Sequence, residues 1–119
     1  MLKERIAEFI EEVRAIDGVE GCALISKDGI MIGKSFPREI SEKWFAAMSA
    51  SVLASAESAA SIISITPPVR VTIDAHDRRI LIHDAGEKLL LVAVLGAKVE
   101  PEPIASSLET VARRVAEAL

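Results

Sequence analysis

The sequence predicts a single α/β (α+β) domain over residues 1–119, with its elements in the order α-β-β-α-β-β-β-α. Apolar residues recur at helical spacing near both ends of the chain. Two pairs of short apolar runs are each joined by polar turn residues, which is typical of β-hairpins. A chain of 119 residues, 50% of them hydrophobic, can fill one core but is too short for two.

The first predicted element is an amphipathic helix that ends before Asp17-Gly18. Two strands follow it, Cys22 to Ser26 and Ile30 to Lys34, around the turn Lys27-Asp28-Gly29. Asp-Gly between apolar runs indicates a hairpin, because the tight turn requires positive φ angles. Pro37 ends the second strand. The apolar side of the helix consists of Leu2, Ile6, Phe9, Ile10, Val13 and Ile16.

A long second helix is predicted from Ser41, which is a suitable N-cap residue, to about Ile63. This helix would be roughly 35 Å long at about 1.5 Å per residue. Pro67-Pro68 follows its end. A second strand pair, Val69 to Ala75 and Ile80 to Asp84, is then expected around a tight turn.

The last two predicted elements are a strand and a helix. Leu89 to Leu95 is a continuous apolar run, which indicates a strand that is buried on both faces. Pro101 and Pro103 lead into the last helix. One side of this helix is formed by Ile104, Leu108, Val111, Val115 and Leu119.

The stretch from Trp44 to Val69 carries most of the functional information. It has 26 residues and one charged side chain, Glu57, although 27% of the whole chain is charged. Between Ala46 and Ser61, twelve of sixteen residues are Ala or Ser. A helix on the surface of a monomer normally has a charged outer face, so this helix is expected to be covered on more than one side.

Three explanations fit this low charge. The helix could be buried wholly within its own fold. It could also span a membrane, although five serines between positions 49 and 61 make the segment only mildly apolar. We favour a third explanation, a twofold homodimer in which the helix meets its own copy, and we expect no membrane insertion.

Small side chains mark the candidate dimer contact. Ala47, Ser51, Ala54 and Ser58 fall on one stripe of the helix, where small residues let two backbones approach closely. Trp44 borders the charge-free stretch and fits either a core position or an interface anchor. The candidate interface residues of the helix are Trp44, Ala47, Met48, Ser51, Ala54, Ser55 and Ser58.

Composition argues against nucleic acid as a partner. The net charge is −4 and only 3% of the residues are aromatic, so the chain offers neither a phosphate-neutralising surface nor stacking platforms. The single cysteine cannot form an intramolecular disulfide, and the first residues carry charges where a signal peptide would be apolar, so we expect a cytoplasmic location. The absence of Asn and Gln fits a thermophilic source.

Histidines and carboxylates do not predict a metal site. His76 and His83 have Asp74 and Asp84 as neighbours, but a structural metal site needs three or four convergent ligands. We expect both histidines to occupy exposed positions of the sheet. No second cluster in the sequence would complete the ligand set.

No residue pattern predicts catalysis or a cofactor either. Cys22 is expected to be a small hydrophobic residue of an interior strand, without a neighbouring base to form its thiolate. Gly18 and Gly21 precede a strand rather than a helix, so they do not form a phosphate-binding loop. We therefore expect that the chain is not an enzyme and binds no cofactor.

Several motifs, taken in order, resemble the Roadblock/dynein-light-chain family over nearly the whole chain. The segment from Ile16 to Gly29, IDGVEGCALISKDG, is similar to the family's motif GV-x-G-x-x-(apolar)-x-S-x-DG. The segment from Glu42 to Ala60 is similar to the family's small-residue central helix. The segment from Arg70 to Leu95 resembles its three closing strands.

This resemblance implies a profilin-like or longin-like fold, with a five-stranded, mainly antiparallel sheet flanked by helices. It also implies a homodimer formed through the second helix and the third strand, which adds Val69 and Val71 to the candidate interface. Family members commonly bind small Ras-like GTPases or belong to scaffolds that do. Arg38 and Lys43, near the start of the second helix, are then candidate GTPase contacts.

The function expected from these arguments is a non-enzymatic, homodimeric module that binds and regulates or scaffolds a small Ras-like GTPase. The alternative is a module of similar topology that senses a small ligand. Such a module needs a cavity with converging polar groups. The sequence offers few candidates for them besides Ser26, Thr72 and Cys22.

Overall fold

Three helices and five strands follow the predicted order in the computed structural model, which describes residues 1–119. The strands form one antiparallel sheet, so the predicted fold class is confirmed. The bounds are α1 Leu2–Arg14, β1 Val19–Ser26, β2 Met31–Ser35, α2 Glu42–Ile62, β3 Arg70–Asp74, β4 Arg78–Asp84, β5 Leu89–Gly96 and α3 Pro101–Ala118.

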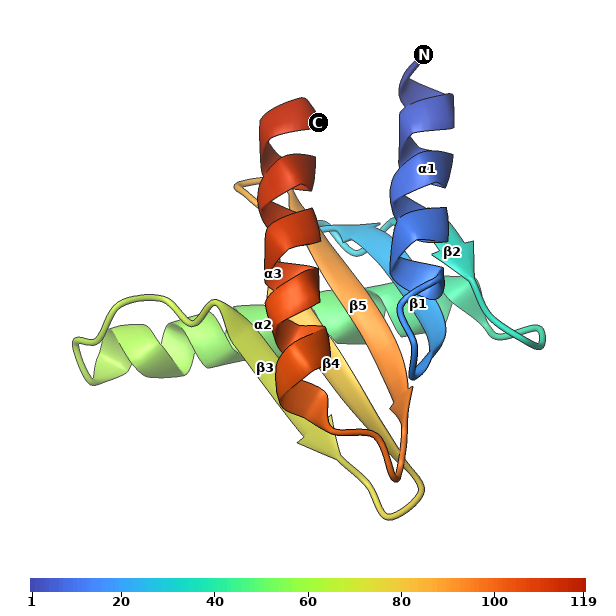
Figure 1. Ribbon diagram of the computed structural model, residues 1–119. Coiled ribbons are helices and arrows are strands. Elements are labelled where there is room, and N and C mark those ends of the chain that lie inside the picture. Colours follow the sequence, from blue (N-terminus) through green and yellow to red (C-terminus); the bar gives the residue numbers. More distant parts are fainter.

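The sheet separates two layers of helices. Its strand order is β2-β1-β5-β4-β3, so β2 and β3 are the edges and β5 lies in the centre. The helices α1 and α3 lie on one face of the sheet, and α2 alone crosses the other face (Figure 1). The continuous apolar run of β5 is explained by this position, because helices cover both of its faces.

Two glycines of the first hairpin permit a tight turn and a close contact between segments. Gly29 has a φ of 87° in the turn between β1 and β2, as the Asp-Gly signal predicted. Gly21 lies under the ring of Phe36, where an added Cβ would come within 2.5 Å of a ring carbon. The connection from β2 to α2 can therefore pass directly over the start of β1.

The two faces of the sheet have cores of different size. The core under α1 and α3 contains 17 buried residues, whereas the core under α2 contains 8. The reason is that α2 contributes mainly small side chains to the interior, with Leu53 as its one large, fully buried residue. The other buried residues of α2 are Ala46, Ser49, Ala50 and Ala60.

The only charge in the middle of α2 has a structural role. The Lys27 ammonium group forms an ion pair with the carboxylate of Asp84 and lies 3.8 Å from a carboxylate oxygen of Glu57. These three residues come from the first hairpin turn, the end of β4 and the flank of α2. Glu57 therefore contacts its own domain and is not on the exposed side of the helix.

One prediction about the sheet is wrong. His76 is exposed as expected, but His83 has only 4% of its surface exposed and lies beneath α3 rather than on an open position. Its Nδ1 lies 2.9 Å from the carbonyl oxygen of Asp84, and its Nε2 is buried without a partner. The polar character of histidine suggested exposure, whereas the alternation of β4 places residue 83 on the same face as buried Leu81.

Replacement of Leu53 by alanine should strongly destabilise the fold. The substitution leaves a cavity in the smaller core, because Leu53 is the one large side chain of α2 that is fully buried there, so we expect a loss of about 2–5 kcal/mol in the free energy of unfolding. Urea denaturation followed by circular dichroism measures this loss. Ser58→Ala, on the exposed side of the same helix, is the control and should change stability by no more than about 0.5 kcal/mol.

Candidate interaction site

The outer face of α2 is exposed, nearly uncharged and partly apolar. Trp44 is 62% exposed, Met48 is 55% exposed and Ile62 is 83% exposed. These three large side chains lie on the side of the helix opposite to Leu53 and share it with small residues. The outer face of α2 consists of Trp44, Met48, Ser51, Ala54, Ser55, Ser58, Ala59 and Ile62.

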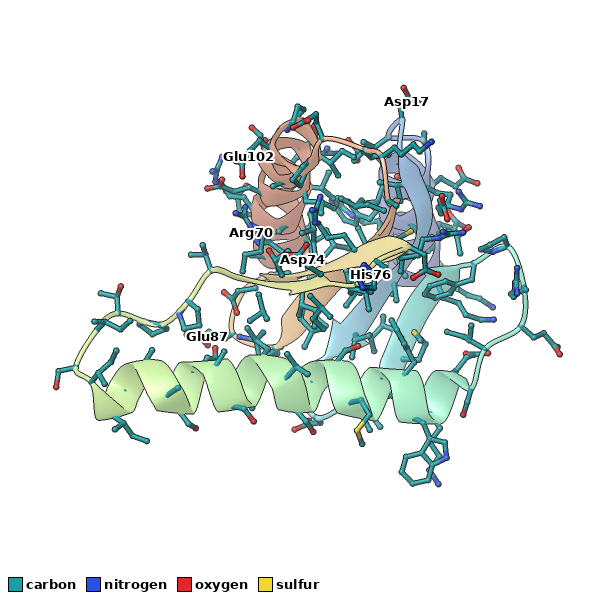
Figure 2. All side chains as sticks on the ribbon, turned by 90° about the horizontal axis from the view of Figure 1, so that it is seen from below. Asp17, Arg70, Asp74, His76, Glu87 and Glu102 are labelled. Carbon is teal, nitrogen blue, oxygen red and sulfur yellow. The ribbon has the colours of Figure 1, made fainter.

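This exposed face continues past the end of the helix. α2 begins near β2, crosses the sheet and extends beyond the β3 edge, so that its last turns have no sheet above them (Figure 1). Figure 2 shows the same projection from another side. Ile63, Ile65 and Val69 in the following connection are each more than half exposed. Several exposed β-branched residues therefore lie together on and after a projecting helix end, which is unusual for the surface of a monomer.

The neighbouring strand β3 leaves one row of backbone groups unpaired. The amide of Asp84 donates to the carbonyl of Val69, and the amide of Ala75 donates to the carbonyl of Arg78. Because an antiparallel ladder alternates, the backbone groups of residues 71 and 73 also face β4. The N–H and C=O groups of Arg70, Thr72 and Asp74 therefore face the open edge.

Side chains alternate in the same way along β3. Val71 and Ile73 lie on the α2 face, where Val71 packs against the smaller core. Arg70, Thr72 and Asp74 lie on the α3 face, and Figure 2 shows Arg70 and Asp74 on that side of the strand. Asp74 forms an ion pair with Arg79 of β4. We call the outer face of α2, residues 63–69 and the open edge of β3 together the α2–β3 surface.

The structure brings most of the predicted interface residues together on this surface. Ala47 differs, because it is half-buried at the flank of α2 and its Cα would lie 3.2 Å from a Cβ added to Gly29. Val71 is half-buried under α2. Five more exposed residues of this surface were not among the predicted ones, namely Ala59, Ile62, Ile63, Ile65 and Ile73.

The two candidate GTPase contacts lie at the other end of α2. Both Arg38 and Lys43 are exposed, and neither forms an ion pair. The Lys43 ammonium group lies 5.9 Å from the centre of the Trp44 ring, so a free positive charge borders the outer face of α2.

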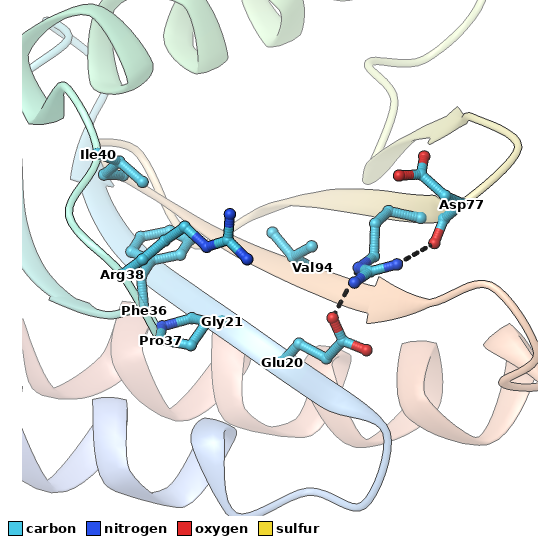
Figure 3. A pocket seen from close by; sticks show the side chains of 9 residues that line it. Glu20, Gly21, Phe36, Pro37, Arg38, Ile40, Asp77 and Val94 are labelled. Atoms are coloured by element: carbon cyan, nitrogen blue, oxygen red, sulfur yellow. Dashed lines mark hydrogen bonds and ion pairs between the residues drawn. The ribbon is translucent and has the colours of Figure 1, made fainter.

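Arg38 also lines a cavity of about 330 Å³ beside the start of α2. Figure 3 shows its guanidinium directed across this cavity toward Val94. On the opposite wall, Arg78 is held by Glu20 at 2.7 Å and by the carbonyl of Asp77 at 2.6 Å. Arg38 is therefore the cation of this cavity that remains available to an anionic partner.

The domain interior contains neither a cluster of metal ligands nor an ionised thiol. No group of three or more His, Cys, Asp and Glu residues could hold a metal ion. Burial raises the pKa of the Cys22 thiol to about 11, although the nearby Arg14 guanidinium lowers it in part. The thiol is therefore protonated at neutral pH, and its Sγ lies 3.5 Å from the carbonyl oxygen of Ile10.

By length and composition alone, α2 is also apolar enough to cross a membrane. Its inner side packs against the sheet: 28% of its apolar stretch is buried, and the helix contacts β1, β2, β3 and β4. Insertion into a bilayer would require the helix to leave the sheet and expose Ile82 and Val92.

Comparisons with known proteins agree with the resemblance seen in the sequence. The family model of the Roadblock/LC7 domain matches residues 5–95. The uncharacterized protein MJ0714 of Methanocaldococcus jannaschii is 28% identical over 92 residues, which cover 77% of this chain and 78% of that protein.

Solved structures share the fold. MglB of Myxococcus xanthus gives a TM-score of 0.90 at 12% identity, over 97% of this chain and 87% of that one. The gliding protein MglB of Thermus thermophilus gives 0.86 at 19% identity, over 98% and 92%. A profilin of Schizosaccharomyces pombe gives 0.69 at 13% identity, over 90% and 93%, which confirms the profilin-like architecture.

Proposed function

The chain belongs to the Roadblock/LC7 domain family, and we propose that it is a non-enzymatic homodimer that binds and regulates or scaffolds a small Ras-like GTPase. The observation that carries the proposal is the α2–β3 surface, which combines an uncharged helix face, exposed isoleucines and an open strand edge. The GTPase is inferred from the family resemblance alone, whereas the dimer is inferred from the composition of α2 together with that resemblance.

A second copy of the chain fits this surface better than other occupants. Exposure of so apolar a surface to water is unfavourable. A twofold contact can cover the uncharged helix face and the exposed isoleucines and can pair the open strand edge at the same time. Two β3 edges can pair antiparallel and extend the sheet across the axis. Each projecting α2 would then lie beneath the partner's sheet and beside the partner's α2. The small residues Ser51, Ser55 and Ala59 would allow the two helices to approach closely.

In such a dimer α2 would lie against protein on both sides and not in lipid. A dimer covers the outer face of α2 from Met48 to Ile62 and leaves Trp44 at its rim, while the inner face keeps its contacts with the sheet. We therefore propose a cytoplasmic protein without membrane insertion.

We propose that the GTPase binds where the start of α2 meets the cavity lined by Arg38. Arg38 and Lys43 supply two positive charges without acidic partners, and Trp44 supplies an exposed aromatic anchor beside them. Charged residues at the rim of an interface increase association rates, and buried aromatic residues contribute affinity. This surface acts by binding a partner, and nothing in it requires a reacting group.

The cavity beside Arg38 is the observation that favours the second candidate, a small-ligand sensor. Its volume of about 330 Å³ is within the range of small-molecule sites, and one free guanidinium faces Phe36, Ile40 and Val94. Screening small carboxylates for a shift in melting temperature tests this alternative. A saturable shift that Arg38→Ala abolishes would support it.

Arginine in the centre of the outer face of α2 should dissociate the dimer without unfolding the chain. Ser51 and Ala54 are exposed, so Ser51→Arg and Ala54→Arg are tolerated by a monomer. In a twofold interface each substitution occurs twice, and overpacking costs about 1–3 kcal/mol per site. We expect a dissociation constant raised about 100-fold or more.

Sedimentation velocity and circular dichroism together measure this outcome. Ser107→Arg, on an exposed position of α3, is the matched control and should leave the mass unchanged. A wild-type chain that stays monomeric at micromolar concentration would contradict the proposed dimer. An unfolded Ser51→Arg variant would instead show that this side of α2 belongs to the core.

Charge reversal at the start of α2 should weaken GTPase binding but not dimerisation. Arg38→Glu and Lys43→Glu replace free positive charges at the proposed contact, and we expect about tenfold weaker binding of a purified Ras-like GTPase from the source organism. Biolayer interferometry with GDP-loaded and GTP-loaded protein measures the affinity. Lys3→Glu on α1 makes the same change of charge and serves as the control. Equal affinities of all three variants would exclude this contact.

A further inference from the structure

We propose that Arg70 and Asp74 form a self-complementary charge code, which makes β3 pair with a second copy of this chain in one register. This inference rests on the proposed homodimer and names the residues that select its partner. The backbone groups and the ionic side chains of β3 favour the same register, and its apolar side chains are compatible with that register. The first two observations are independent of each other.

Backbone pairing limits the choice of register. Arg70, Thr72 and Asp74 direct their N–H and C=O groups to the open edge, so a paired strand must place its own outward residues opposite them. The register centred on Thr72 pairs all three. A shift of two residues leaves one outward residue of each strand opposite a position outside β3, and in one direction that position is Pro68, which has no N–H.

Charge selects the same register. With Thr72 opposite Thr72 of the partner subunit, Arg70 faces the partner's Asp74, and the twofold axis repeats this contact. Directly opposite residues in a hydrogen-bonded pair have Cα atoms about 5.5 Å apart, which allows an ion pair. A shift of four residues would instead place Arg70 against the partner's Arg70, or Asp74 against the partner's Asp74.

Arg70 has no other ionic partner, although the charges around it are paired. Asp74 is already held by Arg79 from β4, and its side chain remains 62% exposed on the open side. Arg70 forms no ion pair within the chain. In the dimer each Asp74 carboxylate would lie between Arg79 of its own chain and Arg70 of the partner subunit. The two copies would thus share two three-membered ion networks, both on the α3 face of the extended sheet.

The apolar side chains of β3 match in the same register. Val71 faces the partner's Ile73 on the other side of the sheet, beside the two α2 helices. Pairs of β-branched residues are favourable in antiparallel strands. Ile73, which is 37% exposed in the single chain, would be covered by this contact.

This arrangement restricts β3 to strands with a positive residue and a negative residue four positions apart in the same order. A related chain with a positive residue opposite Arg70, or a negative residue opposite Asp74, would be repelled. Juxtaposed like charges exclude wrong partners more effectively than matched charges add affinity. The code therefore favours homodimers over mixed dimers when several Roadblock-like chains are present.

Charge-reversal variants of the full chain test the code. In Arg70→Glu, two glutamates face two aspartates across the axis, and in Asp74→Lys two lysines face two arginines. We expect each variant alone to dissociate at least about tenfold more readily than the wild type. In an equimolar mixture of the two variants, every cross-axis pair is again opposite in sign. The mixture should therefore form a heterodimer of nearly wild-type affinity.

Native mass spectrometry of differently tagged chains measures the homodimers and the heterodimer, with circular dichroism to confirm folding. Lys3→Glu is the control for net charge, and Arg70→Gln tests the same position with a neutral side chain and should show a smaller loss of affinity. A mixture as weak as its components would overturn the proposed register, and an unaffected Arg70→Glu homodimer would overturn the code while leaving the homodimer in place. A monomeric wild type would overturn both proposals.

Discussion

The position of α2 across an otherwise uncovered face of the sheet is the constraint on which the other features depend. One helix covers the sheet there, and most of the side chains that it buries are alanine and serine, with Leu53 fully buried and Phe45 and Val52 partly buried beside them. It can therefore lie close to the sheet, but it buries little apolar surface and needs Leu53 as its main anchor. Its outer side has no charged layer, and its end projects beyond the sheet. Both features are unfavourable in water and favourable against a second copy.

The placement of charges supports this account. The acidic and basic residues around α2 are mostly neutralised in pairs at its margins, with Lys27 between Glu57 and Asp84 at one place and Lys34 beside Glu42 at another. Such exposed pairs contribute little stability individually. Their effect is to keep charge away from the outer face of α2, while Arg38 and Lys43 remain free at its start. We propose that the uncharged area meets the second copy and that the charged area, with Arg38, Lys43 and the exposed Glu39, meets another partner.

Most of the fold followed from local signals in the sequence. Asp28-Gly29 fixed the first hairpin because its turn requires a positive φ, and the low charge after Trp44 identified α2 as a helix with an unusual outer side. Helical spacing alone did not show which side of α2 faces the sheet, because alanine and serine occur all around it. Ala47 was therefore assigned to the exposed stripe, and Ile62 was missed. The burial of His83 also depends on the packing of α3 over β4, a contact between segments far apart in the sequence.

The exchange of backbone amide hydrogens in β3 tests the central claim most directly. The amides of residues 71 and 73 face β4 and are protected in any folded chain, whereas those of Arg70, Thr72 and Asp74 face the open edge. If a second copy pairs with this edge, these three amides should exchange slowly at high protein concentration and faster on dilution, as the dimer dissociates. Fast exchange of all three at every concentration, with residues 71 and 73 still protected, would contradict the pairing of β3 across the axis.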